Sequence, residues 1–139
     1  MQTCLTMHLI TMKLPVRFAI GLLLIWMSGA AHAVSAAQDE INHLLDFVAR
    51  SECKFNRNGS WVDAREARRH LQKKYTYLAK RDLAPDAERF IARAASESSM
   101  SGQPYRVQCS DREVILSATW LSNELLRFRK EQGKTDQVR

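Results

Sequence analysis

The sequence predicts an α+β domain in which two antiparallel β-hairpins, about four strands, pack with about four helices and are crosslinked by one disulfide. Three observations predict this fold class. Apolar residues recur at helical spacing in four segments, two other segments alternate as strands do, and two cysteines fall in the alternating segments. The order is helix, hairpin, helix, helix, hairpin, helix, which places the helices on one face of the sheet.

The first 33 residues precede this domain and have the organisation of a secretory signal peptide. Residues 1–17 are basic and contain no acidic residue, residues 18–27 are an apolar run, and residues 31–33 read Ala-His-Ala. A positive region, an apolar region and a small-x-small site in this order predict export and cleavage after Ala33, with Ala36 as the second option. Either Met1 or Met12 fits as the start.

The alternative for this leader is an uncleaved membrane anchor. A helix needs about 20 consecutive apolar residues to span a bilayer, and this run is shorter and ends in small residues. No cysteine follows the run, which disfavours a lipoprotein, and Cys4 would be discarded with the leader. We therefore expect a periplasmic or secreted protein without stable membrane insertion after cleavage.

Cleavage would leave one domain over residues 34–130 and a polar tail over residues 131–139 that we expect to be disordered. Loss of Lys13 and Arg17 lowers the formal net charge from +6 to +4. The charges that remain are interspersed, as on solvated helix faces, and binding to an anionic surface or polymer is the alternative. Nucleic acid is disfavoured as a partner, because the chain is predicted to be exported and contains no nucleic-acid-binding motif.

Cys53 and Cys109 are the two cysteines of the predicted domain, and an oxidising compartment favours a bond between them. Loop-closure entropy gives such a bridge about 4 kcal/mol of stabilisation. The alternative is a redox pair or a metal site. The long spacing excludes CxxC chemistry, and His43 and His70 are a poor zinc complement. We expect no metal and no cofactor.

Helix starts are predicted by capping residues. Asp39 is the predicted N-cap of a helix that ends at Arg50, with Ile41 beginning its apolar face. Asp63, with Glu66 three residues later, predicts a second helix from residue 64 to about residue 80. The Pro-Asp pair at 85–86 opens a third helix, whose apolar face extends to residue 95.

The hairpins are predicted by turn chemistry and alternation. Asn58-Gly59 favours a type I′ turn, which sets Arg57 opposite Ser60 and directs Phe55 toward the core. Residues 105–109 and 113–116 form the second hairpin around a turn at residues 110–112. A hydroxyl-rich loop, residues 96–104, precedes it, and Ser117 or Thr119 caps the last helix.

Several motifs carry a resemblance. The chain resembles the YfeK-like family, small secreted proteobacterial proteins whose domain is of unknown function. The resemblance covers about residues 40–129 and rests on the segments SxCxFxRNG at 51–59, HLxxKY at 70–75, SxSxxSGxPY at 96–105 and Trp120-Leu121. One departure is Asp111-Arg112, where Asp-Gly is expected. The resemblance implies secretion and a common fold, and it brings no activity.

The candidate binding residues come from these motifs, and each also has a structural interpretation. Arg57 could be a solvated hairpin residue or could hold an anion or carboxylate. His70 could be a hydrogen-bonded side chain beside the apolar stripe, and Trp61 and Trp120 could be packing residues or a glycan or partner site. The full set of candidates is Arg57, Asn58, Gly59, His70, Lys74, Ser98, Ser101 and Tyr105.

The sequence leads to two hypotheses for the function. The first is a non-enzymatic domain that binds an envelope protein or an anionic envelope polymer. The alternative is a small hydrolase in which a serine of the 98–101 loop reacts with His70 as the base. No GxSxG elbow or SxxK motif is present, and no catalytic residue is assigned. The sequence does not indicate an oligomeric state.

Overall fold

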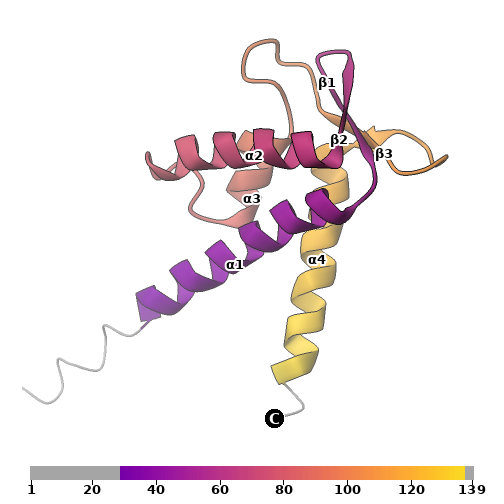
Figure 1. The fold of residues 1–139 in the computed structure, drawn as a ribbon. Helices are drawn as coiled ribbons and strands as arrows, with labels where there is room; N and C mark the ends of the chain where they lie inside the picture. Colours follow the sequence, from indigo (N-terminus) through magenta and orange to yellow (C-terminus); the bar gives the residue numbers. More distant parts are fainter. Residues whose placement is uncertain (1–28, 137–139) are drawn as a thin grey trace, which may run out of the picture. The chain divides into compact units, whose positions relative to one another are not determined.

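A computed structural model describes residues 29–136 and contains an α+β fold with the predicted disulfide (Figure 1). The charged and apolar regions of the expected leader lie outside the described residues. None of the described helices is long and apolar enough to cross a membrane.

The sheet consists of four antiparallel strands in the order β2-β1-β3-β4. Their bounds are Lys54–Arg57 for β1, Ser60–Asp63 for β2, Arg106–Gln108 for β3 and Ile115–Leu116 for β4. Strand β1 pairs with both β2 and β3, so the two hairpins join edge to edge. The predicted register of the first hairpin is confirmed, with Arg57 opposite Ser60.

Turn geometry explains both hairpins. Asn58 and Gly59 have φ of 52° and 85°, the left-handed pair that a type I′ turn requires. In the second hairpin Ser110 takes the left-handed conformation with φ of 53°, and the amide of Arg112 donates to the carbonyl of Cys109. The turn therefore closes without a glycine after Asp111.

Helix α1 (Gly29–Arg50) begins ten residues before Asp39, so the prediction of Asp39 as an N-cap is wrong. The segment before Asp39 is rich in alanine, the residue with the highest helix propensity, and the helix continues through it. Its buried face is the predicted one: Ile41, Leu44, Leu45 and Val48.

Helix α2 (Ala64–Ala79) starts as predicted, because the Asp63 carboxylate accepts a hydrogen bond from the amide of Glu66 at 2.8 Å. The third helical segment has two parts. Helix α3 (Ala87–Phe90), capped by Asp86, passes into the π-helical segment η2 (Ile91–Ala95). The Ser96 hydroxyl closes the wide turn by donating to the carbonyl of Ile91, five residues earlier, at 2.8 Å.

Helix α4 (Ser117–Asp136) continues into the segment that the sequence predicts to be a polar tail. The Arg127 guanidinium is 2.6 Å from the carboxylate of Glu131, an i,i+4 ion pair that supports the helix beyond Lys130. Phe47 of α1 stacks on Trp120 of α4 with ring centroids 4.4 Å apart, and Phe55 of β1 meets the same indole edge-on. Trp120 thus joins two helices and the sheet.

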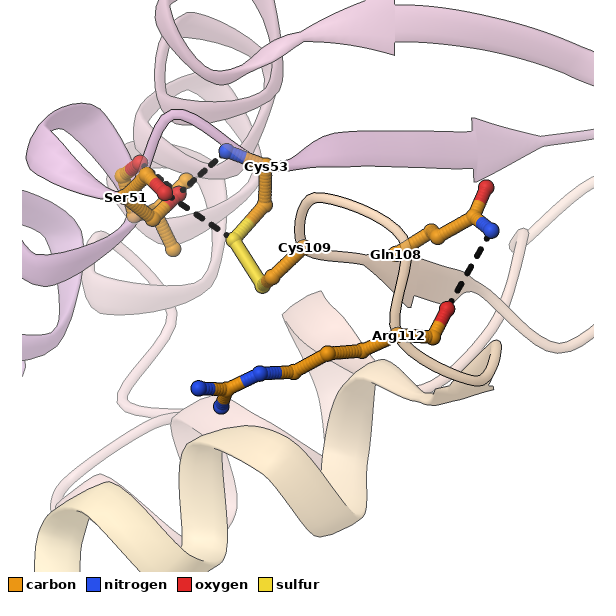
Figure 2. Close-up of a disulfide and its surroundings, with 6 residues drawn as sticks. Ser51, Cys53, Gln108, Cys109 and Arg112 are labelled. Carbon is orange, nitrogen blue, oxygen red and sulfur yellow. Dashed lines mark hydrogen bonds between the residues drawn. A yellow bond between two sulfur atoms is a disulfide. The ribbon is translucent and has the colours of Figure 1, made fainter.

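The core lies between the helices and one face of the sheet. Leu44, Phe90 and Leu121 are fully buried in it, and Phe55 and Val107 face it from β1 and β3. Cys53, just before β1, is bonded to Cys109, just after β3, as Figure 2 shows. The bond therefore links β1 of the first hairpin to β3 of the second hairpin, next to the core.

Candidate functional site

The end of β1 brings Arg57 against helix α2. One guanidinium nitrogen of Arg57 lies 2.7 Å from Nδ1 of His70. Because a guanidinium can only donate, this nitrogen of His70 accepts, and the imidazole is neutral with its proton on Nε2. Arg57 directly precedes the Asn58-Gly59 turn, so the tight hairpin fixes the backbone position from which its side chain extends.

Tyr105 continues this chain of contacts. Nε2 of His70 is 3.2 Å from the phenolic oxygen of Tyr105, and the two rings meet edge to face with centroids 5.9 Å apart. The Ser98 side chain also interacts with the Tyr105 phenol and partly offsets the effect of burial on its pKa. His70 and Ser98, the two candidate residues that act on this phenol, therefore belong to one site.

Lys74 lies one turn further along α2 than His70. Its ammonium donates to the backbone carbonyl of Glu97 at 2.9 Å and lies 5.1 Å from the centroid of the Tyr105 ring. The second contact has the geometry of a cation–π interaction. We call Arg57, His70, Lys74, Ser98 and Tyr105 the Arg57 cluster.

The hydroxyl loop is tied to the hairpin tip beside this cluster. The Ser101 hydroxyl donates to Oδ1 of Asn58 at 2.8 Å, and Figure 1 shows the two segments side by side above α2. Ser98 is buried, with 5% of the residue exposed, and its hydroxyl accepts from the amides of Met100 and Ser101 at 3.4 Å each. The loop serines thus organise their own turn.

Burial and neighbouring charge perturb the titration of the cluster. Burial lowers the pKa of His70, and the positive charges of Arg57 and Lys74 lower it further. Burial also lowers the pKa of Lys74, partly offset by the carboxylate of Glu97. Burial raises the pKa of Tyr105, so the phenol stays protonated at neutral pH. The cluster accordingly contains two cations, a neutral imidazole and a neutral phenol.

A small cavity of about 30 Å³ lies beside the cluster, lined by Arg57, His70 and Tyr105 with apolar side chains of β1, β2 and α2. The carboxylate residue Glu66 also lines it. This volume matches a single water molecule rather than a substrate. The exposed parts of Arg57 and Lys74 are therefore the groups available to a larger ligand.

The structure brings all the candidates to one end of the domain, where the β1–β2 hairpin, α2 and the 96–105 loop meet. Sequence reasoning missed the carbonyl of Glu97, which positions Lys74, and the π-helical segment that turns the chain into this loop. A backbone carbonyl leaves no signal in side-chain identity. The sequence of η2, Ile-Ala-Arg-Ala-Ala, is typical of an ordinary α-helix and gives no sign of the wider turn.

The described residues give no support to the hydrolase alternative. Ser101 donates its hydroxyl hydrogen to Asn58, and both ring nitrogens of His70 are engaged by Arg57 and Tyr105. A serine nucleophile needs a base within hydrogen-bond reach, and here the two groups have other partners. Within residues 29–136, no group of three or more potential metal-ligating side chains lies together.

Comparison with known protein families decides the classification. A family model described as a family of unknown function, DUF5329, matches residues 35–129. The chain belongs to DUF5329. The match covers the four strands, α2, α3, η2 and the Arg57 cluster, so the candidate site lies within the DUF5329 domain. No curated protein and no solved structure matches the chain.

Proposed function

We propose that this DUF5329 protein is an exported, non-enzymatic binding domain that holds an anionic group of an envelope protein or polymer at the Arg57 cluster. One observation carries the proposal. Arg57 is half-buried, and the only side-chain hydrogen-bond partner of its guanidinium among the described residues is a neutral imidazole rather than a carboxylate.

Two other arginines of the same domain provide the contrast. Arg127 binds Glu124 and Glu131, and all the contacts are 2.6–2.8 Å long. Arg129 binds Glu40 and Glu88 at 2.6–2.7 Å. Both arginines have carboxylate partners, Arg127 within α4 and Arg129 on α1 and α3, whereas Arg57 retains most of its five donors for a further acceptor.

The neighbours of Arg57 suit the same ligand. Lys74 adds a second positive charge, and its burial makes that charge less well solvated, which strengthens attraction to an incoming anion. A planar guanidinium can bind a carboxylate or phosphate through two parallel hydrogen bonds. The cavity next to Arg57 and His70 has room for one bridging water molecule.

The predicted location of the protein supports a partner in the cell envelope. The leader pattern predicts export, and a disulfide bond is typical of proteins from oxidising compartments. The narrower resemblance to the YfeK-like group is part of this proposal, as is the periplasmic or secreted location. The proposal does not depend on the oligomeric state of the protein.

Retention on immobilised anionic and neutral polymers tests this function. The disulfide-bonded protein should be retained on polyphosphate or polyglutamate and not on dextran, and Arg57→Gln should weaken retention roughly tenfold, as expected for a charge-assisted pair. Arg69→Gln, an exposed change of equal charge on α2, is the matched control. Equal weakening by both changes would mean that net charge alone causes retention.

A second arm of the same experiment uses an envelope extract. Wild-type protein should capture a partner that Arg57→Gln does not capture. If Arg57→Gln captures the same partner equally well, Arg57 is not the binding residue.

A further inference from the structure

The face of the sheet turned away from the helices carries a second, differently built site. Residues paired across the strands place Trp61, Asn56, Arg106 and Leu116 in one row over all four strands. Side chains alternate between faces along a strand, so this row lies opposite the buried row that contains Phe55 and Val107. Trp61 and Leu116 are 46% and 47% exposed.

A hollow of about 470 Å³ lies over three residues of this row, Trp61, Asn56 and Arg106. We call it the sheet hollow, and its side-chain lining is Asn56, Trp61, Gln103, Pro104, Arg106 and Val114. No residue of the Arg57 cluster lines it, because Arg57 faces α2 and the sheet hollow lies on the other face; Asn56 lines both this hollow and the small cavity beside the cluster. Gln103 and Pro104 come from the same loop that carries Ser98 and Ser101.

The recognition groups of the sheet hollow are unused within the described part of the chain. No hydrogen bond or ion pair there involves the Arg106 guanidinium or the Gln103 side-chain amide. The oxygen of the Asn56 amide accepts from the amide of Gly59 at 3.3 Å, and no hydrogen bond of its NH₂ group is present among the described residues. The Trp61 ring on β2 is thus followed by the Asn56 amide on β1 and the Arg106 guanidinium on β3, and the Gln103 amide comes from the loop that also lines the hollow.

We propose that the sheet hollow binds a saccharide that carries a carboxylate. A sugar ring has an apolar C–H face that fits a flat, exposed indole with one polar end, and hydroxyl groups around its edge that fit amides. Arg106, with no carboxylate partner among the described residues, can take the acidic substituent through a two-pronged hydrogen-bonded pair. Strand spacing puts Trp61 and Arg106 roughly 10 Å apart, which suits two linked sugar rings.

The polarity of the row distinguishes this ligand from a protein surface. The buried centre of a protein interface is depleted in charged residues. Here the centre of the row is Asn56 and Arg106, and the apolar side chains Trp61 and Leu116 are at its ends. A peptide with acidic side chains is the competing ligand, and the test includes it.

Calorimetric titration with three probes tests the proposal: an oligogalacturonate, a neutral galacto-oligosaccharide of the same length, and an oligoglutamate peptide of the same charge. The oligogalacturonate should bind at least tenfold more tightly than either of the others. Binding should quench tryptophan fluorescence, and this quenching should disappear in Trp61→Phe.

Substitutions locate the binding. Trp61→Ala and Arg106→Gln should each weaken oligogalacturonate binding about tenfold or more, with unchanged circular dichroism because both positions are exposed. Tyr77→Ala and Arg81→Gln are the matched controls, since these residues form an exposed aromatic–arginine pair at the end of α2, with 3.7 Å from guanidinium to ring centroid. They should bind as the wild type does.

Four results would overturn the proposal. Equal binding of the neutral saccharide would remove the role of Arg106, and preferred binding of the oligoglutamate would replace the saccharide with a peptide. Failure of all three probes to bind, or equal loss in the Tyr77 and Arg81 controls, would mean that the sheet hollow is not the site.

Discussion

The guanidinium of Arg57 donates a hydrogen bond to Nδ1 of His70 across 2.7 Å. The pair joins the end of β1 to the middle of α2, and it is possible only while His70 is neutral, because a protonated imidazole has no acceptor. The protonation state of His70 therefore controls how Arg57 is held. The Nε2 proton left on the ring points to Tyr105, which extends the control to the loop.

The first prediction concerns this coupling. Arg57→Gln should raise the pKa of His70 toward its ordinary value of 6.5, because one of the positive charges that lower it is removed. Arg69 does not contribute to the lowered pKa, so Arg69→Gln should leave the pKa of His70 nearly unchanged. Titration of the His70 ring signal by NMR measures both. An unchanged pKa in Arg57→Gln would contradict the pairing.

The second prediction concerns stability and pH. A pKa lowered by folding means that the unfolded chain binds the proton more readily. His70 thus contributes stability that is present above pH 6.5 and is lost as the pH falls below 6.5 toward the pKa of the folded state. Urea unfolding at about pH 7.5 and about pH 5.5 should show this loss.

His70→Gln supplies the comparison for that experiment. A glutamine side chain can accept from Arg57 and donate to Tyr105, but it does not titrate. The free energy of unfolding should therefore fall less between the two pH values in His70→Gln than in the wild type. An identical fall would assign the pH dependence to other groups.

The third prediction concerns the disulfide. The bond between Cys53 and Cys109 closes a loop of sequence separation 56, and its removal should cost about 2–4 kcal/mol. The double variant Cys53→Ala/Cys109→Ala, compared with the oxidised wild type in urea, measures this cost. Mass spectrometry of the purified protein should find no free thiol at either position, and two free thiols would refute the bond.

The fourth prediction uses two glycines. Gly59 has φ of 85° in the hairpin turn, so Gly59→Ala should destabilise the fold by about 1 kcal/mol or more. Gly133 lies in helix α4, and apart from the adjoining backbone of that helix nothing lies within 4 Å of the position that an alanine Cβ would take, so Gly133→Ala should stabilise by about 0.5–1 kcal/mol. Thermal unfolding of both variants checks the opposite signs, and a neutral Gly59→Ala would argue against the type I′ turn.

Local chemistry explains which parts of the fold the sequence could predict. The Asn58-Gly59 pair determines turn type and register together, and Asp63 marks the start of α2 with its own side chain. The pairing of β1 with β3 and the passage of α3 into a π-helix depend on contacts between distant segments. The early start of α1 was missed because Asp39, a good capping residue, is also tolerated inside a helix.

The candidate site follows the same division. Motif spacing selected Arg57, His70 and Tyr105 individually, and their convergence needs the packing of α2 against the hairpin. The row from Trp61 to Leu116 cannot be predicted from the sequence, because such a prediction requires knowing which face of the four-stranded sheet the helices leave open. Trp61 and Trp120 look alike in the sequence, yet only Trp61 is exposed.

The most direct test of the central claim is an NMR titration of the disulfide-bonded protein with inorganic phosphate and with acetate. The account predicts that the largest shifts fall on the backbone amides of Arg57 and Tyr105 and on the ring of His70, and that Arg57→Gln abolishes them. Shifts centred instead on the exposed arginines of α2, or shifts that persist in Arg57→Gln, would contradict an anion site at the Arg57 cluster.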